Sequence, residues 1–446
     1  MLMAKFETSF VCQECGYESP AFLGKCPECG EWNSLKEIKI PNTKINSLSA
    51  STQLTSEIKI SKLSDISKVE KNRILTGFSE MDSVLGGGVV RGSVMLLAGD
   101  PGIGKSTLLL QTALNLSNKK LKVLYISGEE SEQQIKLRAQ RLTKNVKNDN
   151  LFLVSLTSTD QAVNLIAENK PDFVIVDSIQ TMESQNLTGL SGSVGQVRYA
   201  AAEFIKLAKT LDIPTILVGH VTKEGMVAGP MVLSHMVDAV LFLEGEKNTG
   251  TRILRSLKNR FGPIDEVGIF AMGEKGIEEI KDPESLFLSK TSGPGSVLVA
   301  TMEGTRSLLV EVQALCVFSK LPMPRRVAAG VDYKRLELVL AVLQKHARLP
   351  VEQMDVFVNV AGGLKLTDPA SDLGICLAIF SSIKNINLSR YVLISEVGLL
   401  GELRTSPFLE KRISQAKKLG FSKVISSKNY KNIAEVVQSL TRTYGK

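Results

Sequence analysis

The fold of this chain is decided by residues 94 to 107, which read Val-Met-Leu-Leu-Ala-Gly-Asp-Pro-Gly-Ile-Gly-Lys-Ser-Thr. An apolar strand pattern runs into a loop that fills the template Gly-x-x-x-x-Gly-Lys-Ser/Thr, and three leucines follow it. The backbone N–H groups of such a loop turn inward around a polyphosphate, and the positive end of the next helix adds to the attraction. The stretch therefore predicts a nucleoside triphosphate site on an α/β sheet.

Each residue of this loop has an expected role. The nucleotide-binding residues that we predict are Gly99, Asp100, Pro101, Gly102, Ile103, Gly104, Lys105, Ser106 and Thr107. We expect Lys105 to contact the β- and γ-phosphates of ATP, and the Ser106 hydroxyl to coordinate Mg²⁺. The alternative, a glycine-rich turn that only joins a strand to a helix, is disfavoured by the buried-type strand before it and the leucines after it.

Strand and helix patterns alternate around the loop, as in α/β folds. Strands are expected at residues 121–126, 151–154, 172–177, 214–219, 237–243, 252–257 and 266–271, and helices at 131–141, 160–169 and 195–211.

Carboxylates stand at the ends of two of these strands. Asp177 ends an apolar strand in the Walker B form, and we expect it to hold Mg²⁺ through its water shell opposite Ser106. Glu129 or Glu130 ends the neighbouring strand and is the candidate for orienting and deprotonating the attacking water, with Glu129 preferred. A capping role at the start of the following helix is the alternative for both glutamates.

Two further strands are followed by polar or glycine-bearing segments. His220 ends the strand 214–219, where it either senses the γ-phosphate or is an ordinary strand-end histidine. Residues 184–196 and 221–230 have the composition of mobile loops, and the first has no bulky anchor beyond leucine. At the carboxyl ends of neighbouring strands, two such loops are placed to line a nucleic-acid channel.

The N-terminal segment carries four of the six cysteines, arranged as two Cys-x-x-Cys pairs ten residues apart: Cys12, Cys15, Cys26 and Cys29. Each pair can place two thiolates on one tight turn, and two such turns complete a tetrahedral shell for a structural Zn²⁺. Two disulfides are the alternative, which is disfavoured in a cytosolic chain that uses ATP. Cys316 and Cys376 lie in apolar segments and are expected in the core.

Composition predicts a globular cytoplasmic protein of two or three domains. The chain has 446 residues, of which 43% are hydrophobic and 22% charged, with no signal-peptide pattern. No apolar run reaches the roughly 18 residues of a membrane span. Residues 411–446 hold nine lysines or arginines against Glu435, so this segment carries the whole net charge of +8. Polyanion binding and a solvated lysine-rich face both remain open.

The stretch Lys258-Asn259-Arg260-Phe261-Gly262 resembles the signature pentapeptide of the bacterial RadA (Sms) family. The phosphate loop, the Asp177 strand, His220 and the glycine-rich loops are similar to the RecA-type motor core, and the four-cysteine module fits the same family. The resemblance covers nearly the whole chain. It implies an ATP-dependent motor that forms a ring, expected to be hexameric, on single-stranded and branched DNA and promotes branch migration beside the RecA recombinase.

The same resemblance assigns roles to two cations. Lys258 and Arg260 follow a β-like run with no obvious acidic neighbour in the sequence, so we expect both to be available to a phosphate. In the family pattern they are trans-acting groups at a subunit interface, with Arg260 on the charge that develops on the γ-phosphoryl group. A surface salt-bridge cluster is the alternative.

The C-terminal segment resembles the peptidase-fold domain of Lon. Asp368–Asp372 falls where the Lon nucleophile motif lies, with Ala370 in place of the serine, and Glu410 stands in place of the lysine. Ser371 and Lys411 are one step out of register, and a serine without a positioned base is not activated. We therefore predict an inactive peptidase fold that helps to assemble the ring. If its further cations face the same side of the ring as the basic segment 411–446, the two groups together form an electrostatic track for DNA; these cations are Arg325, Arg326, Lys334, Arg335, Lys345 and Arg348.

The predicted organisation is a four-cysteine zinc module at 1–36, a linker at 37–70, a RecA-like ATPase core at 71–285 and a Lon-protease-like domain at 286–446. The expected cofactors are ATP, Mg²⁺ and Zn²⁺. Two other functions remain open. An ATP-dependent protease would degrade casein, and a regulatory ATP switch of the clock-protein type would hydrolyse ATP without regard to DNA.

Overall fold

A computed structural model describes residues 6–12, 18–28, 30–41, 62, 73–143, 148–187, 189–219, 233–245, 250–264, 266–280, 287–288 and 293–444. The chain divides into two compact units. The first comprises Met1–Gly245, Arg252–Ile264 and Phe270–Glu279, and the second comprises Glu246–Thr251, Asp265–Ile269 and Ile280–Lys446. Within the described ranges, no helix combines the length and the apolar character that a membrane crossing needs. The predicted domain boundaries at residues 36, 70 and 285 stay predictions.

A small antiparallel sheet lies near the N-terminus, with strand order β2-β1-β3. Its strands are β1 (Phe6–Cys12), β2 (Glu18–Ser19) and β3 (Leu35–Pro41). Cys12, Cys26 and Leu35 form its buried cluster, with Phe10 and Leu23 packed against them.

A nine-stranded sheet surrounds the strand that leads into the phosphate loop, with the order β12-β11-β10-β9-β4-β8-β7-β5-β6. The strands are β4 (Val94–Gly99), β5 (Val123–Ser127), β6 (Leu151–Ser155), β7 (Phe173–Asp177), β8 (Thr215–Val218), β9 (Ala239–Glu244), β10 (Thr251–Asn259), β11 (Val267–Gly273) and β12 (Gly276–Glu279). Strands β4 to β9 pair in parallel, whereas β10 is antiparallel to β9 and β12 to β11.

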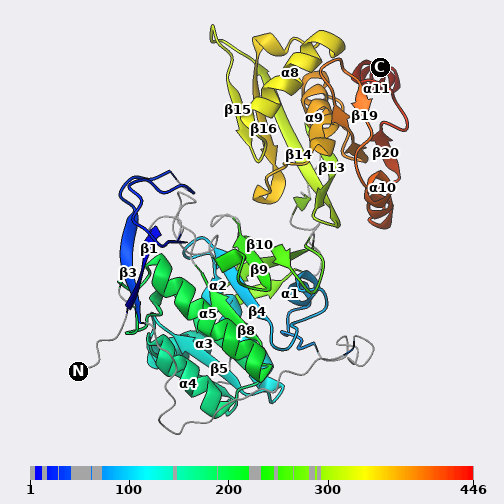
Figure 1. Ribbon diagram of the computed structural model, residues 1–446. Coiled ribbons are helices and arrows are strands. Elements are labelled where there is room, and N and C mark those ends of the chain that lie inside the picture. The colour runs from blue at the N-terminus through cyan, green and yellow to red at the C-terminus, as the bar shows by residue number, and fades with distance from the viewer. Residues whose placement is uncertain are drawn as a thin grey trace, which may run out of the picture. The chain divides into compact units, whose positions relative to one another are not determined.

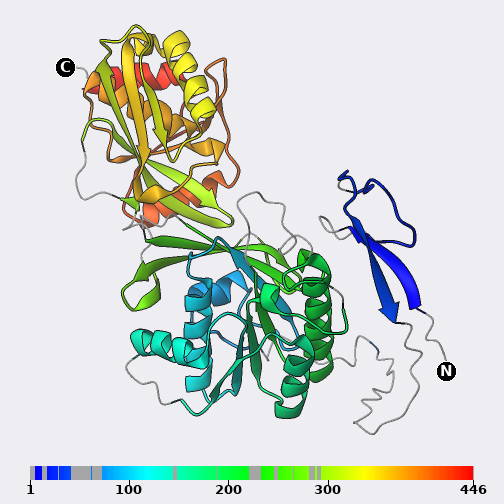
Figure 2. The same ribbon diagram turned by 90° about the vertical axis from the view of Figure 1, so that its left-hand side faces the viewer.

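Helices cover both faces of this sheet, because successive residues of a strand point to opposite faces. In β4, Met95 and Leu97 belong to one buried cluster, and Val94 and Leu96 to the other. The first cluster contains residues of α1 (Ser79–Val84), α2 (Lys105–Asn118) and α3 (Glu132–Leu142), and the second those of α4 (Thr159–Asn169) and α5 (Val194–Leu211). Figures 1 and 2 show the two groups on opposite sides of the sheet. The strands and helices predicted here are confirmed to within two residues, while α1 and β12 were not predicted.

The C-terminal unit has its own six-stranded mixed sheet, with the order β15-β16-β14-β13-β17-β20. The strands are β13 (Ser296–Glu303), β14 (Arg306–Phe318), β15 (Arg326–Ala329), β16 (Met354–Val360), β17 (Tyr391–Ile394) and β20 (Lys423–Ser426). Its helices are α8 (Tyr333–Ala347), α9 (Asp372–Lys384), α10 (Leu409–Lys418) and α11 (Ile433–Tyr444), and a two-stranded ribbon joins β18 (Glu396–Val397) to β19 (Leu403–Arg404). This α/β unit agrees with the predicted fold class.

Candidate functional site

The phosphate loop joins β4 to α2 at the carboxyl edge of the parallel strands. Gly99 has a φ of 150° and Gly104 a φ of 116°. A Cβ atom on Gly99 would lie 2.3 Å from the carbonyl oxygen of Leu243, and one on Gly104 would lie 2.6 Å from Cε of Met272. Gly99 therefore requires glycine because the backbone of β9 approaches the loop too closely for a side chain, whereas Gly104 is favoured by its positive φ, since the nearest atom is the flexible end of Met272.

Lys105 is buried at the first position of α2. Its Nζ donates hydrogen bonds to the carbonyl oxygens of Gly99 at 2.8 Å and Asp100 at 3.0 Å. Burial lowers the pKa of Lys105 to about 8, and the nearby charges of Asp177, Asp100 and Glu129 oppose that change. Burial disfavours the charged form of Lys105, and a phosphate placed beside the ammonium would stabilise that charged form.

Asp177 ends β7 and is buried, as the strand pattern predicts. Tyr125 of the adjacent strand β5 donates a hydrogen bond from its hydroxyl to Oδ2 of Asp177 at 2.5 Å. Burial, and after it the charge of Asp177, raise the pKa of Tyr125 well above its ordinary value, so the hydroxyl keeps its proton. Tyr125 was not among the predicted site residues. Its phenol oxygen in an otherwise apolar strand is the signal that points to it.

The two candidate glutamates after β5 have different partners. Glu129 is exposed and accepts a hydrogen bond from Oγ of Ser178 at 2.7 Å. Glu130 forms an ion pair with Arg138 at 2.6 Å, and Arg138 also donates to the carbonyl oxygen of Ser106 at 3.2 Å. The N-cap of α3 is Ser131, so the helix start does not require either glutamate side chain. The preference for Glu129 as the base stays a prediction.

The loop 184–196 is anchored by a side chain that its composition did not suggest. Gln196 is buried at the start of α5, accepts a hydrogen bond from the backbone N–H of Ser184 at 2.8 Å and donates to the carbonyl oxygens of Ser184 and Leu187, each at 3.1 Å. A buried amide therefore holds this loop through its backbone, which is a polar anchor rather than a bulky apolar one. His220 and the loop 221–230 lie outside the described residues.

Lys258 and Arg260 lie near the amino ends of the parallel strands β4 and β9, whereas the phosphate loop follows the carboxyl end of β4. Asn259 of β10 pairs with Ala239 of β9, and Ala239 pairs with Met95 of β4. Strands rise about 3.3 Å per residue, so the four steps from Met95 to Gly99 span about 13 Å. Arg260 lies one residue further away, which is farther than an arginine side chain extends. Arg260 therefore does not reach the phosphate loop of its own chain.

The expectation that these two cations lack an acidic neighbour is wrong for Arg260. Its NH1 lies 3.3 Å from Oδ1 of Asp238, while Nζ of Lys258 donates to the carbonyl oxygens of Ser234 at 2.6 Å and Val237 at 2.8 Å. The antiparallel pairing of β9 and β10 brings these residues together across more than 20 positions of sequence, which no local pattern reveals. The Arg260 side chain remains 51% exposed.

The small N-terminal cluster holds one cysteine from each predicted zinc pair, Cys12 in β1 and Cys26 between β2 and β3. Cys12 and Cys26 are both buried in the same small cluster, and Cys15 and Cys29 lie outside the described residues. The backbone N–H of Gly30 donates to the carbonyl oxygen of Cys26 at 2.9 Å, as expected for a tight turn at the second pair. In the described part of the chain no three metal-binding side chains gather. The thiol chemistry and the small apolar cluster fit zinc, which would cross-link the module.

We expect Cys26→Ser to remove most of the bound zinc, from about one ion per chain, because hydroxyl oxygen is a poor substitute for thiolate. Atomic absorption on the purified full chain measures the metal. Cys376→Ser is the matched control, since Cys376 is buried within α9 and should leave the zinc content unchanged. Full zinc stoichiometry in Cys26→Ser would contradict the four-cysteine site.

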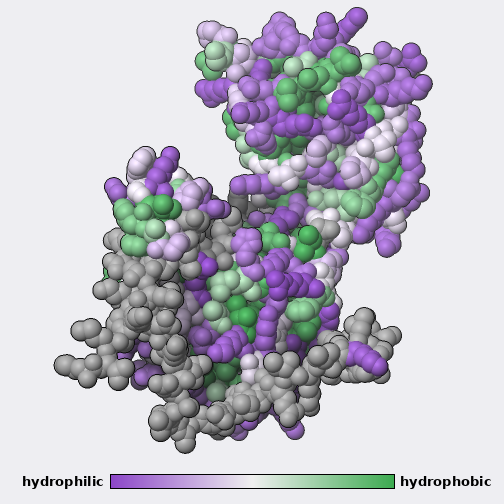
Figure 3. Space-filling model, viewed as in Figure 1, coloured by the Kyte–Doolittle hydropathy of each residue, from purple (hydrophilic) through white to green (hydrophobic). Residues whose placement is uncertain are grey.

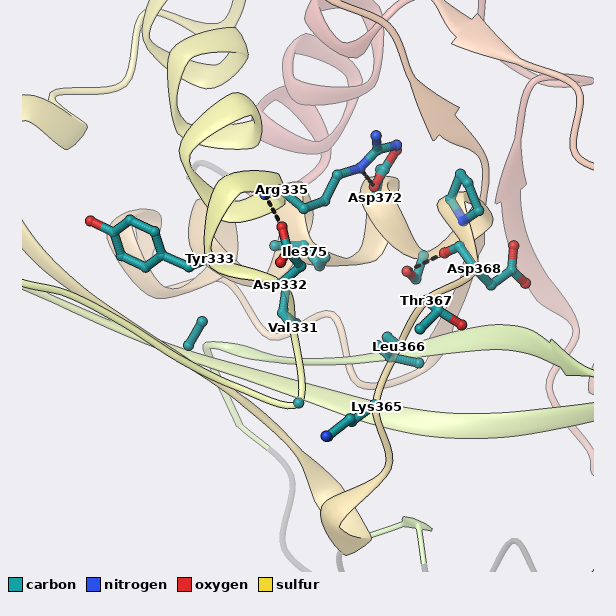
Figure 4. Close-up of a pocket in the computed structure, with 14 residues that line it drawn as sticks. Val331, Asp332, Tyr333, Arg335, Lys365, Leu366, Thr367, Asp368, Asp372 and Ile375 are labelled. Atoms are coloured by element: carbon teal, nitrogen blue, oxygen red, sulfur yellow. Dashed lines mark hydrogen bonds and ion pairs between the residues drawn. The ribbon is translucent and has the colours of Figure 1, made fainter. Parts of the chain in front are cut away.

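The C-terminal unit contains a cavity of about 670 Å³ beside Asp368–Asp372, shown in Figure 4. Ser371 is buried, and its Oγ donates to the carbonyl oxygen of Asp368 at 2.6 Å. The buried cation next to this segment is Arg412, which donates to Oδ2 of Asp368 at 2.5 Å, whereas Lys411 is exposed. A guanidinium stays protonated and cannot act as a general base, so this geometry supports the predicted lack of peptidase activity.

Three of the cations considered for a DNA track have partners within the protein, and the inclusion of Arg412 is wrong because it is buried, whereas Arg326 and Arg335 remain partly exposed. Arg326 donates to the carbonyl oxygen of Val351 at 2.6 Å, Arg335 pairs with Asp372, and Arg412 is buried. The cations that remain exposed are Arg325, Lys334, Lys345, Arg348, Lys411, Lys417, Lys418, Lys423, Lys428, Lys431 and Arg442. In Figure 3 hydrophilic residues line the outer edge of this unit, with intermediate and hydrophobic residues between them, which fits both a polyanion surface and a solvated face.

Comparisons with known proteins agree with this geometry. Residues 60–226 match a family model described as an AAA domain, and residues 10–37 match one described as a rubredoxin metal binding domain. The predicted nucleotide core and the N-terminal metal module are thereby confirmed.

Curated relatives match over nearly the whole chain. It is 48% identical to the DNA repair protein RadA of Halalkalibacterium halodurans, with 95% of this chain and 93% of that protein covered. It is 47% identical to RadA of Bacillus subtilis, with the same coverage, and 45% identical to RadA of Listeria monocytogenes, with 96% and 94% covered. A crystal structure of the RadB recombinase matches 46% of this chain and 99% of that chain at 23% identity and a TM-score of 0.38.

Proposed function

Because the chain belongs to the RadA family of DNA repair proteins, we propose that it is an ATP-driven motor that promotes branch migration of recombination intermediates. In this proposal it acts in the cytoplasm as a ring, expected to be hexameric, on single-stranded and branched DNA together with a RecA recombinase. The family membership and the AAA domain support the ATPase, and the motor activity is our extension of them.

The observation that carries the proposal is the separation of Arg260 from the phosphate loop along β4. Met95, which pairs with β9 opposite Asn259, is about 13 Å from Gly99, so one chain holds the loop and the cation at opposite edges. Adjacent copies could bring the cation of one to the loop of the next. Repetition of that contact around an axis gives a closed ring.

At each such interface we assign Lys105 to the β- and γ-phosphates, Glu129 to the attacking water, and Arg260 of the adjacent copy to the γ-phosphoryl charge. Ser106 and Asp177 would hold Mg²⁺, which when bound neutralises phosphate charge. Tyr125 fixes the orientation of the Asp177 carboxylate through its 2.5 Å hydrogen bond.

DNA binding is assigned to phosphate contacts rather than to base stacking. Exposed lysines and arginines are numerous in the C-terminal unit, while aromatic residues make up 5% of the chain. Backbone contacts of this kind are tolerant of sequence and weaken steeply with salt.

The test is ATP hydrolysis by the full chain with and without single-stranded DNA, at about 50 mM and about 200 mM salt. We expect DNA to stimulate hydrolysis several-fold at low salt and less at high salt. Lys105→Ala under the same conditions shows how much of the rate comes from a contaminating ATPase. A rate that ignores DNA at both salts would favour the ATP switch, and ATP-dependent cleavage of casein would favour the protease.

A further inference from the structure

Asp238 is a buried carboxylate fixed to the start of β4. It is 3% exposed. Its Oδ2 accepts a hydrogen bond from the backbone N–H of Val94 at 3.0 Å, and its own N–H donates to the carbonyl oxygen of Val94 at 2.8 Å. The first hydrogen bond fixes the side chain of Asp238 against Val94 of β4, and the second fixes its backbone.

The other oxygen of the same carboxylate faces Arg260. Oδ1 lies 3.3 Å from NH1 of Arg260, and the carbonyl oxygen of Asp238 accepts a hydrogen bond from the Arg260 backbone N–H at 3.0 Å. Nζ of Lys209 lies further from Oδ1, at 3.9 Å. Arg260 is thus held at its backbone and at one guanidinium nitrogen, while half of its side chain remains exposed.

Lys258 is bound to the same turn, residues 233–238. Its Nζ donates to the carbonyl oxygens of Ser234 and Val237, and burial and then the charge of Arg260 lower the pKa of Lys258. One short turn therefore fixes the direction of both cations of the pentapeptide.

We propose that Asp238 is a positioning residue that holds Arg260 in the orientation needed to reach the nucleotide of an adjacent copy. The inference rests on the proposed trans role of Arg260. An exposed arginine has many rotamers, and confining it costs side-chain entropy. Asp238 confines it before the copies meet, which lowers the cost of assembling the site.

Asp238→Asn tests this role. The asparagine oxygen can still accept from the N–H of Val94, but its NH₂ then faces the nitrogens of Arg260 and Lys209. We expect kcat for DNA-stimulated ATP hydrolysis to fall about tenfold with KM for ATP unchanged, because orientation is lost and nucleotide binding is not. Lys209→Ala is the matched control, since it removes a cation from the same carboxylate and leaves Arg260 paired.

A double-mutant cycle separates positioning from a structural effect. In an Arg260→Ala background, Asp238→Asn should lower kcat no further, because the side chain through which Asp238 acts is gone. An additive loss, an unchanged kcat or a raised kcat in Asp238→Asn would each overturn the proposal. Asp238→Ser, which removes the charge but keeps a small hydroxyl, takes the same place in the cycle if the asparagine variant does not fold.

The cycle also distinguishes the two claims. If Arg260→Ala alone keeps normal turnover, the trans role fails, and the inference about Asp238 fails with it. If Arg260→Ala loses turnover while Asp238→Asn does not, only the inference about Asp238 fails.

Discussion

Lys105→Ala should reduce ATP hydrolysis on the order of a thousandfold, because it removes the ammonium that we assign to the transferred phosphoryl group. The fold should survive, since burial disfavours this charge and alanine relieves that cost at the same helical position. Steady-state turnover with saturating ATP, together with the melting temperature, measures both effects. Lys119→Ala, at the other end of α2, is the control and should keep normal turnover. Normal hydrolysis in a folded Lys105→Ala variant would contradict the assignment of the phosphate loop.

The pKa of Lys105 gives this prediction a pH dependence. In the nucleotide-free protein the pKa is about 8, and phosphate bound beside the ammonium raises it. Above pH 8, ATP binding must therefore take up a proton, and affinity should fall as pH rises until the pKa of the bound state is reached. Calorimetry in two buffers with different ionisation heats measures this uptake, which Lys105→Ala should abolish. No difference between the buffers at pH 9 would contradict it.

Arg260→Ala should lower DNA-stimulated hydrolysis by about a thousandfold while nucleotide binding persists, as expected for a group that stabilises the transition state from a neighbouring copy. The Arg260 side chain is half exposed but its partner Asp238 is buried, so the variant leaves that carboxylate with Lys209 as its cation at 3.9 Å, and the melting temperature should be measured beside turnover. Arg255→Ala removes another ion-paired arginine, in β10, and should leave turnover near normal.

Mixing the two inactive variants tests the trans arrangement. Arg260→Ala keeps an intact phosphate loop and Lys105→Ala keeps Arg260, so an interface of the right order contains one complete site. Mixed assemblies should therefore hydrolyse ATP faster than either variant alone. If mixing restores nothing, or if Arg260→Ala promotes branch migration normally, Arg260 belongs to a surface ion-pair cluster instead.

Short-range patterns predicted the ATPase core well, because burial and turns there depend on neighbours in the sequence. The strand and loop from Val94 to Thr107, and Asp177 at the end of its strand, lie where the patterns placed them. The boundaries of C-terminal elements were not predicted at all. The position of Arg412 was also misjudged. It is one of nine lysines and arginines in residues 411–446, which suggested an exposed side chain, but it is buried against Asp368.

The sequence did not reveal the roles of Asp238 and Tyr125, and the reason is the same for both. Asp238 meets Arg260 only because two strands pair, and Tyr125 meets Asp177 only because β5 lies next to β7. Such contacts depend on strand order, which a single sequence does not specify.

The phosphate loop and Arg260 lie at opposite ends of the parallel strands, and this separation determines how many complete sites an assembly can hold. Under the proposed arrangement a lone chain has no complete site. An open row of chains has one complete site fewer than it has chains, and only closure of the ring adds the missing site. Turnover per chain should then climb with concentration until the circle is complete and level off there.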